Sequence, residues 1–182
     1  MADPIKLAYF MAVKEGASYL GGLLVTDTSG IPTDFRYTEP ITPTRLQSIL
    51  YGKSLEPHLK EEVIQKTLLK ELKAPPDLFI LSATELAGGW SGDAKYPVLA
   101  VQKSQEAPLG KVGEAFRAGP RELLLQLADG AAPLRVIFAA SVDAMAQEQA
   151  VVKLLEAGYH MDLTEPLERV TAALQSLVVK EA

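Results

Sequence analysis

Residues 5–39 read IKLAYFMAVKEGASYLGGLLVTDTSGIPTDFRYTE, and this stretch decides the fold class. Residues 5–13 form an apolar and aromatic run that is too short for a good helix, which favours a strand. Residues 19–27 form a second run of the same kind. Gly16 lies between the two runs, where a turn needs a residue that tolerates positive φ. The two runs therefore predict neighbouring strands joined by a turn.

Residues 33–39 predict a third strand of a different kind. Phe35 and Tyr37 would point to one face of this strand, and the polar residues between them to the other. Such alternation is typical of a strand that is buried on one face only. The first forty residues therefore predict an antiparallel meander. Residues 21–32 (GGLLVTDTSGIP) also resemble the strand, aspartate and turn of small α+β regulatory domains of the roadblock and longin type. No function is inferred from this resemblance.

A corner follows the third strand. Thr42 suits the N-cap of a helix, and Pro43 suits its first position, because the missing N–H of proline costs nothing there. Gly52 ends this helix. A second helix, capped by Ser54, carries an apolar stripe and ends at the prolines of residues 74–76.

The rest of the chain alternates short apolar runs with helical patterns. A leading proline and a closing glycine predict a helix over residues 120–130. Further helices are predicted from Ser141 to about residue 157 and from Thr164 onwards. Short strands are predicted at residues 77–82, 97–104, 133–140 and 159–163.

Together these elements predict an α+β fold, with a mixed α/β fold as the alternative. The meander would extend into a mixed sheet of six or seven strands, covered by helices and followed by a helical carboxyl terminus. Three strands alone cannot bury both of their faces, so we expect one domain over residues 1–182. The prolines at residues 74–76 are the one plausible internal boundary.

The composition narrows the range of functions. A formal charge of −5 and a pI of about 5.1 argue against nucleic acid and against an anionic membrane as partners. The absence of cysteine excludes disulfides, thiolate nucleophiles and cysteine-bound metals. No signal peptide and no apolar run of bilayer length is recognisable. We therefore expect a cytoplasmic protein without a cofactor or a metal site.

Polar residues at the ends of three strands form the first candidate site. If at least two of these strands were parallel, their carboxyl ends would converge, and open α/β sheets bind ligands at that edge. Helix N-termini there would favour an anion or a hydroxylated small molecule. The alternative is that these residues only cap helices. The candidate ligand-binding residues are Thr38, Glu39, Thr42, Glu85, Ser141 and Asp143.

The corner after the third strand is a second candidate site. Arg36 and Arg45 could clamp a phosphate or the carboxylate of a partner. The alternative is that Glu39 pairs with either arginine on the surface, where such pairs contribute little to stability.

Trp90 is a candidate partner-binding residue. It is the single tryptophan and lies in the glycine-rich stretch of residues 86–97, LAGGWSGDAKYP. Tryptophan on a loop is a common anchor for a partner, because it dominates binding hot spots. The alternative is a connection whose tryptophan folds back onto the core. The glycines do not match a phosphate-binding loop.

Two classes of function remain open at this stage. The first is a non-catalytic interaction or adaptor module, with a protein partner or a second copy of the chain bound through the sheet edge, the Trp90 loop or the arginine corner. The second is a small-molecule binding protein or an enzyme with its site at the strand carboxyl ends. The sequence favours the first class, because no tuned nucleophile or acid–base pair is recognisable.

Overall fold

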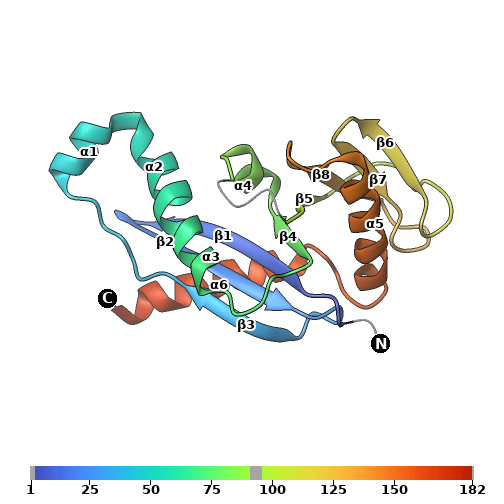
Figure 1. Cartoon of the computed structure of the whole chain (residues 1–182), viewed down its shortest axis with the longest axis horizontal. Coiled ribbons are helices and arrows are strands. Elements are labelled where there is room, and N and C mark those ends of the chain that lie inside the picture. The colour runs from blue at the N-terminus through green and yellow to red at the C-terminus, as the bar shows by residue number, and fades with distance from the viewer. Residues whose placement is uncertain (1–2, 91–95, 182) are drawn as a thin grey trace.

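The computed structural model describes residues 3–90 and 96–181, and its centre is one mixed eight-stranded sheet (Figure 1). The strand order is β3-β2-β1-β4-β5-β8-β7-β6. The expected α+β class is confirmed, although the sheet has eight strands rather than six or seven. The strands are β1 Leu7–Glu15, β2 Ser18–Thr26, β3 Pro32–Tyr37, β4 Leu78–Leu81, β5 Val98–Lys103, β6 Ala115–Gly119, β7 Glu122–Leu125 and β8 Leu134–Phe138.

The helices fall into an arm between β3 and β4, a short helix after β4, and two long carboxyl-terminal helices (Figure 1). The arm bends at Gly52, whose φ is 54°, and its first part projects beyond the sheet. Its segments are α1 Arg45–Tyr51, the 3-10 turn η1 Gly52–Ser54, α2 Leu55–His58, the π-helical η2 Leu59–Gln65 and α3 Lys66–Glu71. The remaining helices are α4 Ala83–Ala87, α5 Ala144–Gly158 and α6 Glu165–Glu181.

The meander forms as the sequence predicts. β1 and β2 pair antiparallel along their whole length, and β3 pairs antiparallel with β2. Gly21 lets the arm lie close to the sheet, because a Cβ atom at this position would be 2.1 Å from Cγ2 of Ile64 in η2. A side chain here would therefore push the arm off β2.

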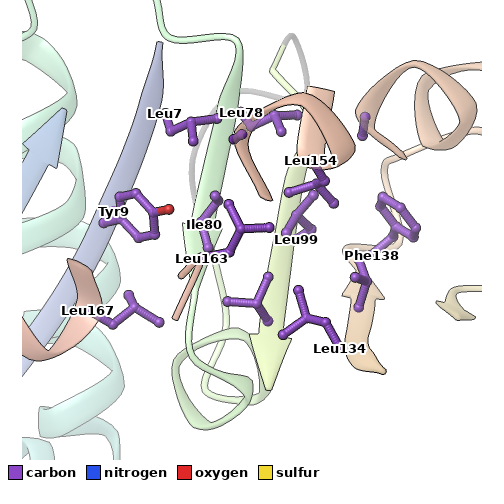
Figure 2. Close-up of a cluster of buried hydrophobic side chains, with 14 of the residues drawn as sticks. Leu7, Tyr9, Leu78, Ile80, Leu99, Leu134, Phe138, Leu154, Leu163 and Leu167 are labelled. Atoms are coloured by element: carbon purple, nitrogen blue, oxygen red, sulfur yellow. The ribbon is translucent and has the colours of Figure 1, made fainter. Parts of the chain in front are cut away.

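Apolar side chains cover both faces of the sheet. On one face, side chains of β1, β4, β5 and β8 pack against α5, α6 and the link between them (Figure 2). Figure 2 shows Tyr9 and Ile80 of the sheet near Leu163 and Leu167, and Leu154 near Leu99. The other face of β1, β2 and β4 packs against the arm through Ile64 and Leu68. These contacts position the strand ends on which the candidate sites lie.

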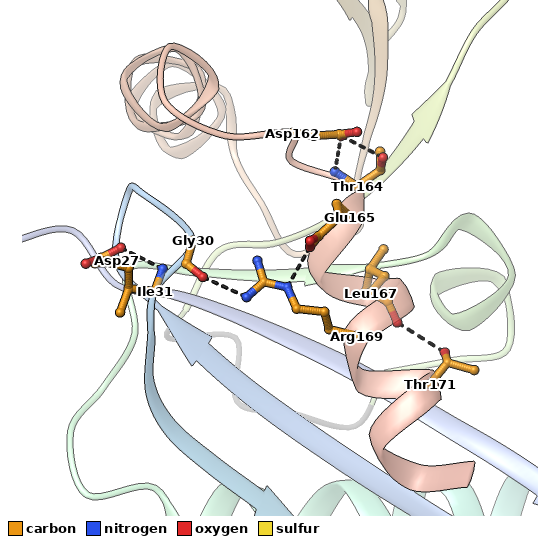
Figure 3. A network of polar contacts seen from close by, with 9 residues as sticks. All are labelled: Asp27, Gly30, Ile31, Asp162, Thr164, Glu165, Leu167, Arg169 and Thr171. Atoms are coloured by element: carbon orange, nitrogen blue, oxygen red, sulfur yellow. Dashed lines mark hydrogen bonds and ion pairs between the residues drawn. The ribbon is translucent and has the colours of Figure 1, made fainter. Parts of the chain in front are cut away.

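A polar network ties α6 to the turn after β2 (Figure 3). Arg169 donates from Nη1 to the carbonyl oxygen of Gly30 at 2.7 Å, and its Nε pairs with Oε2 of Glu165 at 2.6 Å. Asp27 stabilises the turn by accepting from the backbone N–H of Ile31 at 3.0 Å. The last helix is therefore fixed to the amino-terminal meander by charge-assisted hydrogen bonds.

Two predicted elements are wrong. Residues 120–130 hold β7 instead of a helix, because Glu122–Leu125 pairs with β6 on one side and β8 on the other. Residues 159–163 form turns instead of a last strand. Within the described ranges, no helix combines the length and apolar character needed to cross a bilayer.

Candidate functional site

The strand-end residues do not come together as a single cluster. β3 and β4 run parallel, but β2 and β1 lie between them. β8 runs antiparallel to β5, so Ser141 and Asp143 follow a strand that points in the opposite direction. In the described part of the chain, no hydrogen bond or ion pair joins Glu39, Glu85 and Asp143 to one another.

The corner residues make local contacts. Thr38 is buried, and its Oγ1 accepts from the backbone N–H of Gly21 at 3.0 Å. Arg36 pairs with Asp34 at 3.1 Å rather than with Glu39, because Asp34 lies two residues away on the same face of β3. Arg45 is exposed at the start of α1, and Glu39 is exposed as well.

Two of the predicted helix caps are wrong by two residues. The N-cap of α1 is Thr44, whose side chain accepts from the N–H of Gln47 while the Gln47 side chain accepts from the N–H of Thr44. This reciprocal pair satisfies two donors, which Thr42 could not do. Thr42 instead shares a hydrogen bond with Ser18 at 2.6 Å. The cap of α5 is Asp143 rather than Ser141, since Asp143 Oδ1 accepts from the N–H of Ala146 at 2.8 Å.

Glu85 is the buried carboxylate of this region, with 5% of its surface exposed. It lies on α4 at the point where β1 and β4 separate, and its Oε1 accepts from the backbone N–H of Ala12 at 3.4 Å. Lys60 Nζ lies 3.2 Å from Oε2 without hydrogen-bond geometry. Burial raises the pKa of Glu85, and the charge of Lys60 opposes that rise only in part. Glu85 on α4 therefore contacts both Lys60 of the arm and Ala12 of β1, and it links these three elements.

A shallow hollow of about 300 Å³ lies on the α6 side of the same junction. Met11 and Ser82 line it from the sheet, and Glu168 and Gln175 line it from α6. Glu168 is its single carboxylate. Hard cations such as Mg²⁺ need several oxygen ligands, usually from more than one carboxylate. Across residues 3–90 and 96–181, no group of three His, Cys, Asp or Glu residues is placed to hold a metal ion.

Trp90 packs against the sheet, as in the core-facing alternative from the sequence. Its ring centroid lies 5.5 Å from that of Phe10 and 5.3 Å from that of Phe79. Its indole Nε1 is buried and has no acceptor among the described residues. Tryptophan usually finds a partner for this N–H when it is buried, so the unpaired donor is unusual. Residues 91–95 of the predicted glycine-rich loop lie outside the described residues.

A cleft of about 530 Å³ lies between α4 and the end of β8. Three small or apolar residues of α4 and the ring of Trp90 form one side, and residues 137–141 form the other. Arg121, from the turn between β6 and β7, lies at the rim. Binding sites for small molecules typically have volumes of 300–1,000 Å³ with mostly apolar walls and a few polar groups, and this cleft has that character. We call it the Trp90–Arg121 cleft.

Arg121 was missed by the sequence analysis because it fell inside the wrongly predicted helix. Its carbonyl oxygen accepts from the N–H of Phe138 at 2.7 Å, which fixes it beside the end of β8. Its side chain is exposed and makes no ion pair within the described residues. By contrast, Arg135 pairs with Glu122 and Arg169 pairs with Glu165. Arg121 is therefore a guanidinium available to a ligand.

No protein-family model matches the chain, and no curated protein matches it significantly. Solved structures do match. The chain is similar to endonuclease V from Streptomyces avermitilis, with a TM-score of 0.56, 14% identity and coverage of 100% of this chain and 87% of that one. It is similar to endonuclease V from Bacillus subtilis, with a TM-score of 0.57, 13% identity and coverage of 100% and 84%.

A third similar structure is endonuclease V from Ciona intestinalis, solved with a 23mer DNA that contains an inosine followed by a ribo-adenosine. The TM-score is 0.54 at 12% identity, with coverage of 98% of this chain and 87% of that one. At these identities the likeness shows a shared fold, and it extends over almost the whole chain.

These neighbours contradict two conclusions from the sequence. The non-catalytic adaptor that binds a protein partner or a second copy is wrong, because the similar structures are endonucleases. The exclusion of nucleic acid is wrong as well, because the Ciona intestinalis structure contains DNA. Net charge was a poor guide, since it averages over the whole surface and says nothing about the local charge of a binding face.

A metal centre does not fit the described residues. Nucleases often hold two metal ions about 4 Å apart between converging carboxylates. Here Glu85 is buried and paired with Lys60, and Glu168 is the single carboxylate at the neighbouring hollow. Among the described residues, none that lines the Trp90–Arg121 cleft is a carboxylate. We therefore derive no step through a metal ion.

Proposed function

We propose that this chain binds nucleic acid and accommodates one unstacked base in the Trp90–Arg121 cleft. The observation that carries the proposal is the cleft itself, an apolar hollow with an aromatic wall and an available guanidinium. The fold that it shares with endonuclease V over 98–100% of the chain supports this choice of ligand. Proteins that bind single strands combine the same two elements, aromatic rings for the bases and cations for the backbone.

Stacking would supply the main favourable interaction in the cleft. Every base has an apolar face, and stacking on an aromatic side chain contributes about 1–3 kcal/mol per base. Trp90 is held in place by Phe10 and Phe79, so little side-chain freedom is lost on binding.

Arg121 would contact either the face of the base or a phosphate. Guanidinium groups stack on flat rings and also bind phosphate through two parallel hydrogen bonds. With a formal charge of −5, the chain as a whole repels a polyanion. We therefore expect few phosphate contacts and a shallow dependence of affinity on salt, since the slope scales with the number of phosphates neutralised.

Fluorescence anisotropy with labelled oligonucleotides tests the proposal. We expect single-stranded DNA or RNA to bind more tightly than duplex at low salt, because a duplex must first unstack its base. Arg121→Ala should weaken binding about tenfold with an unchanged melting temperature, in line with the loss of one charge-assisted contact. Lys111→Ala is the control, because Lys111 is also an exposed cation but does not line the cleft.

Two results would contradict the proposal. One is the absence of binding to any single strand or duplex at low salt. The other is an Arg121→Ala variant that binds as tightly as the wild-type protein. A gel assay for strand cleavage on the same oligonucleotides would show whether hydrolysis accompanies binding. The cytoplasmic location expected from the sequence stays a prediction, and cell fractionation would check it.

A further inference from the structure

A second cavity, of about 310 Å³, lies between the end of the arm and the strand β4. Trp90 lines both this cavity and the Trp90–Arg121 cleft. The remaining walls come from the last turn of α3, from Pro75 and Pro76, and from Phe79 and Tyr96. We call this cavity the Lys70–Lys73 pocket, after the two lysines in its lining.

Aromatic rings form the inner wall of this pocket. Phe79 lies between the other two, with its ring centroid 5.3 Å from that of Trp90 and 5.8 Å from that of Tyr96. The rings are tilted against one another by 48° and 59°. Tilted rings offer both faces and edges, and a flat aromatic ligand packs well against such a surface.

The two lysines are both exposed and unpaired. Lys70 lies in the last turn of α3 and Lys73 follows three residues later, and neither makes an ion pair within the described residues. Two other lysines on the arm form ion pairs, because Lys60 pairs with Glu85 and Lys66 pairs with Glu62. Lys73 also lines a neighbouring hollow together with Asp34, and Asp34 pairs with Arg36.

We propose that the Lys70–Lys73 pocket binds a nucleoside monophosphate. The base would lie against Trp90, Phe79 and Tyr96, and the phosphate would lie at the two lysines. A phosphate monoester carries a charge of about −1.5 to −2 at neutral pH, which two lysines can match. The volume, at the lower end of the range for small-molecule sites, suits one base with its phosphate outside. This site does not depend on the nucleic-acid function proposed above.

The single tryptophan makes binding directly observable. Trp90 lines the pocket, so its fluorescence should change when a base packs against it. We would titrate the full chain separately with adenosine, guanosine, cytidine and uridine 5′-monophosphates. Adenosine and ribose 5-phosphate serve as ligands that lack the phosphate or the base. We expect at least one monophosphate to bind, and each partial ligand to bind about tenfold more weakly.

Variants distinguish this pocket from the cleft on the other side of Trp90. The double variant Lys70→Ala/Lys73→Ala should lower the affinity for the monophosphate about tenfold or more. Lys66→Ala is the matched control, because Lys66 lies on the same helix but pairs with Glu62 and does not line the pocket. Arg121→Ala should leave monophosphate binding unchanged while it weakens oligonucleotide binding. Circular dichroism melts of each variant would show that the fold is intact.

Three outcomes would overturn the proposal. In the first, no monophosphate changes the fluorescence or raises the melting temperature. In the second, the double variant binds as the wild-type protein does, which would mean that the lysine stems only cover an apolar gap. In the third, binding depends on Arg121 and not on the lysines, which would place the ligand in the cleft. If oligonucleotides fail to bind while a monophosphate binds and depends on the two lysines, only the nucleic-acid function proposed above would be refuted.

Discussion

The two halves of the sheet are covered differently. β1 and β2 have α6 on one face and the arm on the other, and residues 7–10 and 20–26 of these strands are buried. β8 and β7 bury one face under α5, but the other face of this half carries Arg135, Ile137, Glu122 and Phe116, which are half-buried or exposed. Trp90 and α4 lie at the border between the halves.

Because of this difference, the residues that stabilise the fold and the residues that line the cleft lie in different parts of the sheet. In the first half, helices cover both faces of β1 and β2, so most changes to the buried side chains there alter packing. In the second half, the uncovered face leaves room for the Trp90–Arg121 cleft. The residues that line the Trp90–Arg121 cleft therefore come from the second half and the border.

Two phenylalanines on the same face of the sheet give the largest contrast. Phe10 is buried beside Trp90, whereas Phe116 on β6 is 57% exposed. We expect Phe10→Ala to lower the free energy of unfolding by about 3–5 kcal/mol, because it leaves a cavity. Phe116→Ala should change it by less than about 0.5 kcal/mol. Urea unfolding measures both, and equal losses would show that the second half is covered as well.

Two glycines give the next contrast. An added Cβ at Gly21 would meet Ile64 at 2.1 Å, whereas at Gly119 on β6 the nearest atom would be 3.9 Å away. Gly21→Ala should therefore cost about 1–3 kcal/mol through overpacking, and Gly119→Ala should cost almost nothing. Thermal melts of the two variants would measure the difference. A harmless Gly21→Ala would mean that the arm can shift away from β2.

Two helix caps sharpen the comparison further. Ser82 caps α4 at the border, and Thr44 caps α1, which has no buried residue. We expect Ser82→Ala to lower the free energy of global unfolding by about 1 kcal/mol. Thr44→Ala should only fray α1, since local opening of an unpacked segment does not report on the whole fold. Hydrogen exchange would separate these cases, and a global loss from Thr44→Ala would show that α1 is packed in solution.

The smallest expected effect is a pH dependence from Glu85. Burial raises its pKa in the folded protein above the ordinary value of 4.5, so the folded state keeps a proton that the unfolded state has released. Stability should therefore fall as pH rises from about 4.5 through the raised pKa. Glu85→Gln should remove this slope, which unfolding of both proteins at a series of pH values would measure. A wild-type advantage over the variant that grows with pH would contradict the expectation.

Local patterns made the meander predictable. Alternation at Phe35 and Tyr37 and the turn at Gly16 depend on neighbouring residues alone. The β6–β7 hairpin was not predictable in this way, because the apolar run at residues 123–125 fits a helix or a strand equally well. Its pairing with β8, which begins nine residues later, decides the outcome.

The candidate site was harder to predict than the fold. Trp90, Arg121 and Ile137 lie on three separate segments, and only the strand order brings them to one cleft. From the sequence, polar residues near strand ends were the predicted site residues. Several of them instead accept hydrogen bonds from nearby backbone N–H groups. Asp143 caps α5, and Thr38 accepts from the backbone of Gly21.

The contact of α6 with β1 and β2 has a consequence for biosynthesis. The ribosome makes these two strands long before the helix that covers one of their faces. The nascent chain must therefore carry an uncovered apolar surface until residues 165–181 have been made, and such a surface aggregates or recruits chaperones. The contact of Arg169 with Gly30 can form only after that point.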